Sequence, residues 1–317
     1  MLFFLAFLIL SPPSLLSLES ADEKYLKLNQ VLFEFYNHFE SLEKNAEAKK
    51  SAEKLLEQYP DDPYFYDLWA SIEWTLIGHE LNLKIDEQAK ISHLPNYAER
   101  AAKYYALVEK GLSLTESAEG QIKAKTLLAR ANLFFDRAKF TARFGNGLSD
   151  LSRADKDSAE AIKTLKNLLA EDQSFCPAYF LMGAVRYGLT AKTENSLTYQ
   201  FFVWLKSKTY AEFYQTDKNV LDKTRALEWL EKSYQCENPE LWLKKNWIES
   251  AIFLAGSYEN YKKDLKIAKE LELMETKEMP LLENLISLFP ENKGLKEKLD
   301  LVNLRVRILK NYLFPKR

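Results

Sequence analysis

The feature that most constrains this chain is the scarcity of residues that interrupt helices. Its 317 residues include only 9 glycines and 10 prolines, whereas Leu, Ala, Lys and Glu are abundant. These four residues all favour helix. Apolar residues recur at spacings of three and four, as in Leu28, Val31, Leu32, Phe35 and Phe39. The pattern predicts an all-α protein of roughly a dozen helices with no strand.

Composition places the chain among ordinary water-soluble proteins. Hydrophobic residues make up 47% and charged residues 28%, and the net charge is −2. No excess of basic residues exists to attract nucleic acid or an anionic membrane, so we expect no nucleic-acid partner. Aromatic residues, at 13%, are rich for a helical chain.

The N-terminal residues 1–20 have the composition of a signal peptide. The apolar run "LFFLAFLIL" is too short to span a bilayer, and "SPPSLLSLESA" follows it. No Lys or Arg precedes the run, and cleavage is expected near Ser20. An uncleaved anchoring segment or a buried core helix are the alternatives. We therefore expect a periplasmic or otherwise exported location in the cell envelope, with residues 21–317 forming a single all-α domain.

Punctuating residues predict where several helices begin and end. Pro60 and Pro63 break the chain in "YPDDP", and Pro63 suits the first turn of a helix that extends to about residue 83. Asn45 is a candidate cap for the helix before it. The "GNG" at 145–147 predicts a break between two long helices.

Small and large residues recur in an order that indicates helical hairpin repeats. The tetratricopeptide repeat, about 34 residues long, places small residues where its two helices approach and large ones between units. "LLAEDQSFCPAYFLMGA" at 168–184 fits this order. Its matching residues are Leu169, Asp172, Ala178, Tyr179, Met182 and Gly183, preceded by Ala161, Leu165 and Leu168.

Two further stretches match the same repeat. The first has Ala48, Ala52, Leu55 and Pro60 followed by Tyr66, Trp69 and Ala70; the second has Ala226, Leu230, Ser233 and Pro239. We therefore predict a tetratricopeptide-like superhelix with long inserts between helices. A generic helical bundle is the alternative. The terminal helix is expected to cap the array with Leu295, Leu299, Val302, Val306 and Leu309.

The order of these segments resembles one family, the T-component proteins of tripartite ATP-independent periplasmic (TRAP) transporters. The resemblance extends over about residues 45–275 and is carried by "YPDDP" at 59–63, "NYAERAAKYYALVEKGL" at 96–112, "KNLLAEDQSFCPAYFLMG" at 166–183, "ALEWLEKSY" at 226–234 and "WIESAIFLAGSYENYKKDL" at 247–265. It implies an exported accessory protein that binds a periplasmic solute-binding protein. The family's Gly-rich interhelical loop and its lipid-attachment cysteine have no counterpart here.

The long insert at 190–222 is the candidate contact region. Its aromatic residues either cover the core or form an exposed surface for a partner or a small apolar or amphipathic ligand. The candidate binding residues are Tyr199, Phe202, Trp204, Tyr210, Phe213 and Tyr214.

The two cysteines, Cys176 and Cys236, are a candidate disulfide. In an oxidising compartment such a pair can bridge. Cys176 precedes the first helix of a predicted hairpin and Cys236 follows the second. The two ends of an antiparallel hairpin are neighbours, so the bridge requires Cα atoms no more than about 7 Å apart. We expect such a bridge to tie the aromatic insertion at its base as well.

Nothing in the sequence indicates catalysis, a metal or a cofactor. His38, His79 and His93 have no metal-binding spacing, and no nucleophile or phosphate-binding motif is present. The function expected is that of an exported binding or scaffold protein with no catalytic residues, and homo-oligomerisation is left open. An all-α enzyme that uses carboxylates, or a purely structural envelope protein, are the alternatives.

Overall fold

The computed structural model describes residues 14–81, 96–116, 122–145, 147–195, 197–204, 207–236 and 240–314. This part of the chain is all-helical and contains no strand. The prediction of an all-α protein is confirmed. The expected leader falls mostly outside the described residues, apart from the start of the first helix.

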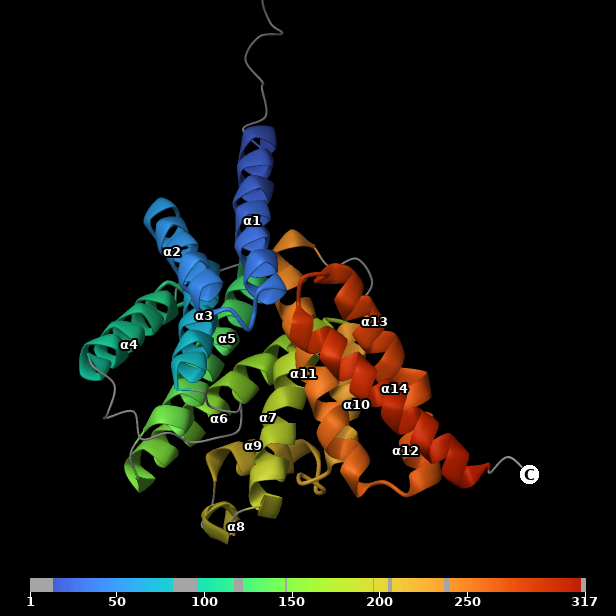
Figure 1. Cartoon of the computed structure of the whole chain (residues 1–317). Coiled ribbons are helices and arrows are strands. Elements are labelled where there is room, and N and C mark those ends of the chain that lie inside the picture. The colour runs from blue at the N-terminus through green and yellow to red at the C-terminus, as the bar shows by residue number, and fades with distance from the viewer. Residues whose placement is uncertain are drawn as a thin grey trace, which may run out of the picture.

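Six helices form the N-terminal half (Figure 1). They are α1 (Ser14–Asn37), α2 (Leu42–Gln58), α3 (Pro63–Glu80), α4 (Tyr97–Ser113), α5 (Ile122–Phe144) and α6 (Leu148–Glu171).

The C-terminal half is more irregular. It contains α7 (Pro177–Asn195), α8 (Leu197–Trp204), α9 (Lys208–Thr216), α10 (Lys223–Tyr234), the 3₁₀ turn η2 (Leu241–Leu243), α11 (Lys244–Tyr261), the 3₁₀ turn η3 (Lys262–Asp264), α12 (Ile267–Leu273), the π-helical turn η4 (Met274–Glu278), α13 (Met279–Leu288) and α14 (Lys293–Leu313). The predicted insert therefore contains two short helices of its own.

The starts of α2 and α3 follow the capping rules, although one cap differs from the predicted residue. Pro63 begins α3 as expected, and the Asp62 side chain accepts a hydrogen bond from the Tyr64 amide. The expected cap Asn45 is wrong, because Ser41 caps α2 four residues earlier. Asn45 instead lies inside the helix, fully buried, where its amide donates to the Phe39 carbonyl at 2.8 Å.

Each helix of the N-terminal half packs against the next one along the chain. The order changes at α7, whose most extensive contact is with α10 rather than with α8. The helix α9 packs instead on α6, and α8 contacts α7 at its end. Figure 1 shows α8 and α9 at the end of the molecule away from the N-terminus of α1. The segment between α7 and α10 is thus an insertion into one antiparallel pair.

Close approach within this pair requires a glycine. A Cβ added at Gly183 of α7 would lie 2.9 Å from the Ala226 carbonyl oxygen and 2.8 Å from Leu230 Cγ in α10. Ala226 and Leu230 are themselves fully buried. The residues on which the repeat prediction depends therefore bring α7 and α10 into direct contact.

One contiguous hydrophobic core connects the two halves. It extends from Tyr25 in α1 to Leu309 in α14. The small residues Ala48, Ala52 and Ala161 are all buried in it. Packing of this kind is what positions the insertion and its surroundings.

Candidate functional site

The structure divides the described candidates of the aromatic insertion between core and surface. Phe213 is fully buried and its ring packs against Trp229 with centroids 5.9 Å apart. Phe213 is therefore a core residue, which corrects its assignment to a contact surface. Tyr210 is half-buried and stacks on Tyr214, which is 44% exposed.

The other three candidate side chains lie outside the described residues. These are the side chains of Tyr199, Phe202 and Trp204. Other apolar groups of the same insertion are exposed. Leu197 is 81% exposed and Phe201 is 58% exposed, both on α8, and Leu221 is 37% exposed.

The helix α9 is held on α6 by a single carboxylate. Asp155 accepts hydrogen bonds from the Ser207 hydroxyl at 2.6 Å, the Lys208 amide at 2.6 Å and the Thr209 amide at 3.1 Å. A negative charge at the first turn also complements the helix dipole. Lys166 of α6 adds an ion pair to Glu212 at 3.0 Å. The first turn of α9, in the middle of the insertion, is therefore attached firmly to α6.

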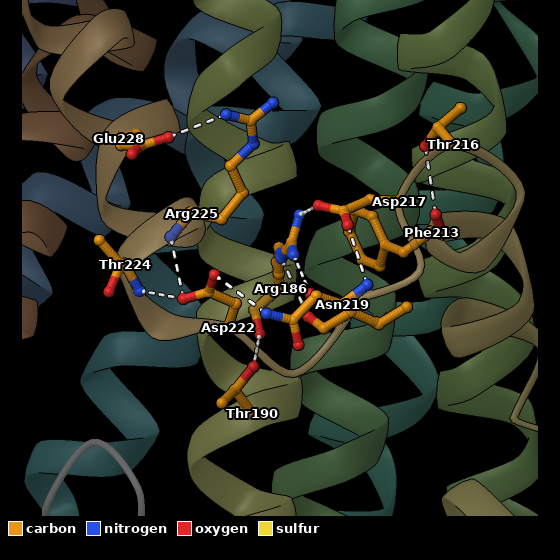
Figure 2. Close-up of polar contacts among 11 residues, drawn as sticks. Arg186, Thr190, Phe213, Thr216, Asp217, Asn219, Asp222, Thr224, Arg225 and Glu228 are labelled. Atoms are coloured by element: carbon orange, nitrogen blue, oxygen red, sulfur yellow. Dashed lines mark hydrogen bonds and ion pairs between the residues drawn. The ribbon is translucent and has the colours of Figure 1, made fainter.

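The loop that follows α9 is held by a buried arginine of α7, shown in Figure 2. Arg186 is fully buried, and its Nε donates to the Val220 carbonyl at 2.9 Å. Its second terminal nitrogen donates to the Asn219 carbonyl. Arg186 Nη1 lies 2.9 Å from Asp217 Oδ2, an ionic contact rather than a well-directed hydrogen bond.

Aromatic rings complete the surroundings of this guanidinium. Its carbon lies 5.0 Å from the centre of the Trp229 ring and 6.0 Å from that of Phe213. A buried charge is costly unless it is paired and hydrogen-bonded, and these contacts meet that need. The Asn219 amide and the Arg186 guanidinium together lower the pKa of Asp217. Arg186 thus fixes the loop 217–222 on α7.

Two hollows are lined in part by residues of α9. One, of about 460 Å³, is lined by Thr216, Asp217, Asn219, Asp222, Arg225 and Trp229. The other, of about 430 Å³, is lined by Phe134, Arg137, Lys156, Asp157, Ala159, Glu160, Lys163, Lys208, Ala211 and Glu212. Both are open to solvent.

The polar groups of the hollows are largely engaged with one another. Asp222 caps α10 through the Thr224 amide at 2.9 Å and accepts a bond from the Asn219 side chain, as Figure 2 shows. In the second hollow Arg137 contacts both carboxylate oxygens of Asp157, at 2.8 and 2.7 Å. Small-molecule sites are usually concave and mostly apolar. Both hollows are instead open to solvent and lined mostly by charged or polar side chains.

A second polar cluster lies deep between α3, α5 and α11. Asp67 is fully buried and accepts hydrogen bonds from Lys245 Nζ and Asn132 Nδ2, both at 2.9 Å. Asn132 and Asn246 exchange amide hydrogen bonds, and Lys245 also pairs with Glu249 at 2.9 Å. These contacts join segments far apart in the sequence.

Burial and the charge of Lys245 shift the pKa of Asp67 in opposite directions. Burial raises the pKa of Asp67 to about 7; Lys245 opposes this effect, and Asp136, within hydrogen-bonding reach, adds to it. Asp67 and Glu249 in turn raise the pKa of Lys245 against the effect of burial. Asp136 Oδ2 is buried and has no hydrogen-bond partner within the described chain. Neither hollow is lined by this pair.

The structure joins Cys176 and Cys236 in a disulfide with Cα atoms 6.2 Å apart. The bridge connects the turn before α7 to the residues after α10. It lies at the other end of this helix pair from the insertion, because α7 runs from the bridge toward α8. The expectation that the disulfide ties the base of the insertion is therefore wrong. Arg186 and Asp155 hold the insertion instead.

The described histidines are satisfied by neighbours. His79 Nδ1 lies 3.1 Å from the Asn45 amide, and burial lowers the pKa of His79. His38 lies 3.3 Å from both Glu34 and Glu291. His93 is outside the described residues. The part of the chain that the structure describes contains no group of three metal-binding side chains.

Sequence reasoning missed Arg186 and Asp67. Each is the single charge of an otherwise apolar helical segment, "PAYFLMGAVRYGL" for Arg186 and "PYFYDLWASI" for Asp67. Such a charge is a usable signal, because an apolar helix buries all its faces and the charge then needs a buried partner.

Comparison with known proteins identified no relative. No family model matches the sequence, no curated protein matches it, and no solved structure matches it. Among the described helices none is both long and apolar enough to cross a lipid bilayer.

Proposed function

We propose that this chain is an exported helical scaffold without catalytic residues, which binds a protein partner through its aromatic insertion. The observation that carries the proposal is the contrast between the base and the outer part of the insertion. Arg186 and Asp155 hold the base rigidly, whereas Leu197, Phe201 and Tyr214 stay exposed. Apolar groups held out in solvent on a rigid support are typical of interaction sites.

The shape of this surface favours a protein over a small ligand. The exposed side chains lie on α8 and along α9, at the outer end of the molecule (Figure 1). Small molecules need concave, apolar sites, and the hollows beside α9 are open and rich in charge. A small apolar or amphipathic ligand therefore ranks second among binding partners.

A tetratricopeptide-like arrangement is the finer form of the fold that we propose. The packing of α7 on α10 at Gly183, and the buried positions of Ala48, Ala52 and Ala161, support it. With the resemblance to TRAP T-component proteins, it leads us to propose an accessory role beside a periplasmic solute-binding protein. A periplasmic location and a cleaved leader belong to the same proposal.

An all-α enzyme that uses carboxyl groups is the second candidate function. Asp67 favours it, because a carboxyl group with a raised pKa can exchange protons near neutral pH. However, Asp67 already accepts hydrogen bonds from Lys245 and Asn132 and has no exposed surface. A buried structural network explains these contacts without a substrate, so we rank the scaffold first.

Site-specific photo-crosslinking in the native cell tests the scaffold proposal. A photoreactive amino acid at Leu197 or Phe201 should give a defined protein adduct. The same amino acid at Leu148, which is 71% exposed on α6, should not. Competition by the unlabelled chain should remove the adduct.

Two results would count against this function. Equal adducts at residues 148, 197 and 201 would show collision rather than binding. No protein adduct at 197 or 201, together with a bound lipid or other small molecule seen by native mass spectrometry, would favour the small-ligand alternative.

A further inference from the structure

The last helix has an apolar stripe that no part of the described chain covers. Val302, Val306 and Leu309 of α14 are buried against the core. A second set of apolar residues points elsewhere, and these side chains are between 51% and 70% exposed: Leu301, Leu304, Ile308 and Tyr312. Their spacings of three and four place them on one face of the helix.

This stripe lies on a rigid support. The two guanidinium contacts of Arg305 with Glu270 of α12, at 2.9 and 3.1 Å, hold α14 from the side. Lys310 pairs with Glu275 at 2.5 Å. In Figure 1, α14 is at the edge of the C-terminal half, away from α8 and α9. The stripe is therefore a surface separate from the aromatic insertion.

The stripe is complementary to itself when two copies run antiparallel. With Leu304 at the centre of the crossing, Leu301 is three residues before it and Ile308 four residues after it. Each Leu301 then faces the Ile308 of the other helix. A two-fold axis repeats every contact between the copies, so the Leu301–Ile308 contact occurs twice in the interface.

The charges beside the stripe match in the same register. Asp300 lies four residues before Leu304 and Arg307 three residues after it, on the same flank of the helix. Residues on the same flank face each other across an antiparallel helix pair. Both residues are exposed, and neither forms an ion pair or hydrogen bond within the described chain. Two Asp300–Arg307 pairs would therefore form between copies.

We propose that the chain forms a two-fold homodimer through antiparallel pairing of α14 about Leu304. A second copy is the partner that fits the stripe, because the apolar residues and the flanking charges of one α14 face matching residues of an antiparallel α14. A single pair of helices buries less surface than a standard interface, so the dimer should be weak. We expect a dissociation constant on the order of 1 to 100 μM.

Sedimentation equilibrium of the purified chain tests the dimer. The wild type should show a monomer–dimer equilibrium in this concentration range. Leu304→Glu and Ile308→Glu should remain monomeric at the highest concentration. Leu148→Glu, a change of a leucine on α6 that is 71% exposed, should dimerise like the wild type. Circular dichroism checks that every variant is folded.

Charge reversal tests the antiparallel register. Asp300→Arg alone places like charges opposite each other twice, as does Arg307→Asp alone. Each should raise the dissociation constant about tenfold. An equimolar mixture of these two variants should form a heterodimer, because position 300 of each chain then faces an opposite charge at position 307 of the other. The chain that carries both changes should dimerise like the wild type.

Three results would overturn the proposal. The first is a wild type that stays monomeric at several hundred micromolar. The second is a dimer that survives Leu304→Glu and Ile308→Glu, which would place the interface elsewhere. The third is a mixture of the two single charge variants that associates no better than each alone, which would exclude the antiparallel register.

Discussion

Gly183 allows the close approach of α7 and α10, because it has no Cβ atom. A methyl group there would meet the Ala226 carbonyl oxygen at 2.9 Å, and a backbone oxygen cannot move away without shifting the helix. The neighbouring Gly188 of the same helix has open space around its Cβ position. The two glycines therefore form a matched pair.

We expect Gly183→Ala to lower the free energy of unfolding by about 1–3 kcal/mol through overpacking. Gly188→Ala should raise it by about 0.5–1 kcal/mol, because alanine is the better helix former and meets no neighbour. Urea denaturation of both variants measures the difference. Equal effects of the two changes would contradict close packing at Gly183.

The role of Arg186 could not be predicted from the sequence. Its helix, α7, begins within the stretch 168–184 from which we predicted a helical hairpin. Its partners are backbone carbonyls and Asp217, in a loop whose path no local pattern specifies. The charge itself indicated a buried partner, but only the tertiary structure shows which one.

Elements are joined in pairs, and the disulfide joins the ends of one pair. Cys176 precedes α7, Cys236 follows α10, and 60 residues separate them. A crosslink restricts the unfolded chain and so stabilises the folded one. For a loop of this length the chain-entropy relation gives about 4 kcal/mol.

We expect reduction to lower the free energy of unfolding by up to about 4 kcal/mol. Guanidinium denaturation with and without dithiothreitol measures this change. The variant Cys176→Ala/Cys236→Ala should be as unstable as the reduced wild type and should not respond to the reductant. Two reactive thiols in the native protein before any reduction would contradict the bridge.

The bounds of most elements were predictable, because turn residues act locally. Asp62 and Pro63 begin α3, and Gly147 separates α5 from α6 with a positive φ of 85°. Asn45 was misassigned because several polar residues compete as caps and the burial of the helix decides among them. The outer face of α14 was also missed, because an apolar residue is not marked in the sequence as buried or exposed.

At the scale of the whole molecule, the network around Asp67 couples global stability to pH. Asp67 lies on α3, Asp136 on α5 and Lys245 on α11. The pKa of Asp67 is raised to about 7 in the folded state, against about 4 for an unfolded aspartate. Between these values the folded state holds a proton that the unfolded state has lost.

The sign of the effect follows from proton linkage. Stability falls with rising pH wherever the folded state binds more protons than the unfolded state. This contribution should therefore be present in full below about pH 4, decline through neutral pH, and be absent above about pH 7. The total loss is on the order of 4 kcal/mol.

Asp136→Asn provides the test. It removes the like charge beside Asp67 and supplies an amide that can donate to it, so the pKa of Asp67 should fall. The loss of stability between pH 5 and pH 8 should become smaller than in the wild type. Asp155→Asn, a change outside the network, should leave the loss unchanged. An identical pH dependence in wild type and Asp136→Asn would contradict the coupling.

The helices, most of their ends, and the pairing of α7 with α10 across a long insertion could be predicted from local sequence patterns. These depend on local propensity, periodicity and the placement of small residues, all of which act over a few turns of chain. Local sequence patterns did not predict which charges meet inside the core or which apolar faces stay in solvent. Asp67 and Lys245 are 178 residues apart, and such contacts depend on how all the helices pack together.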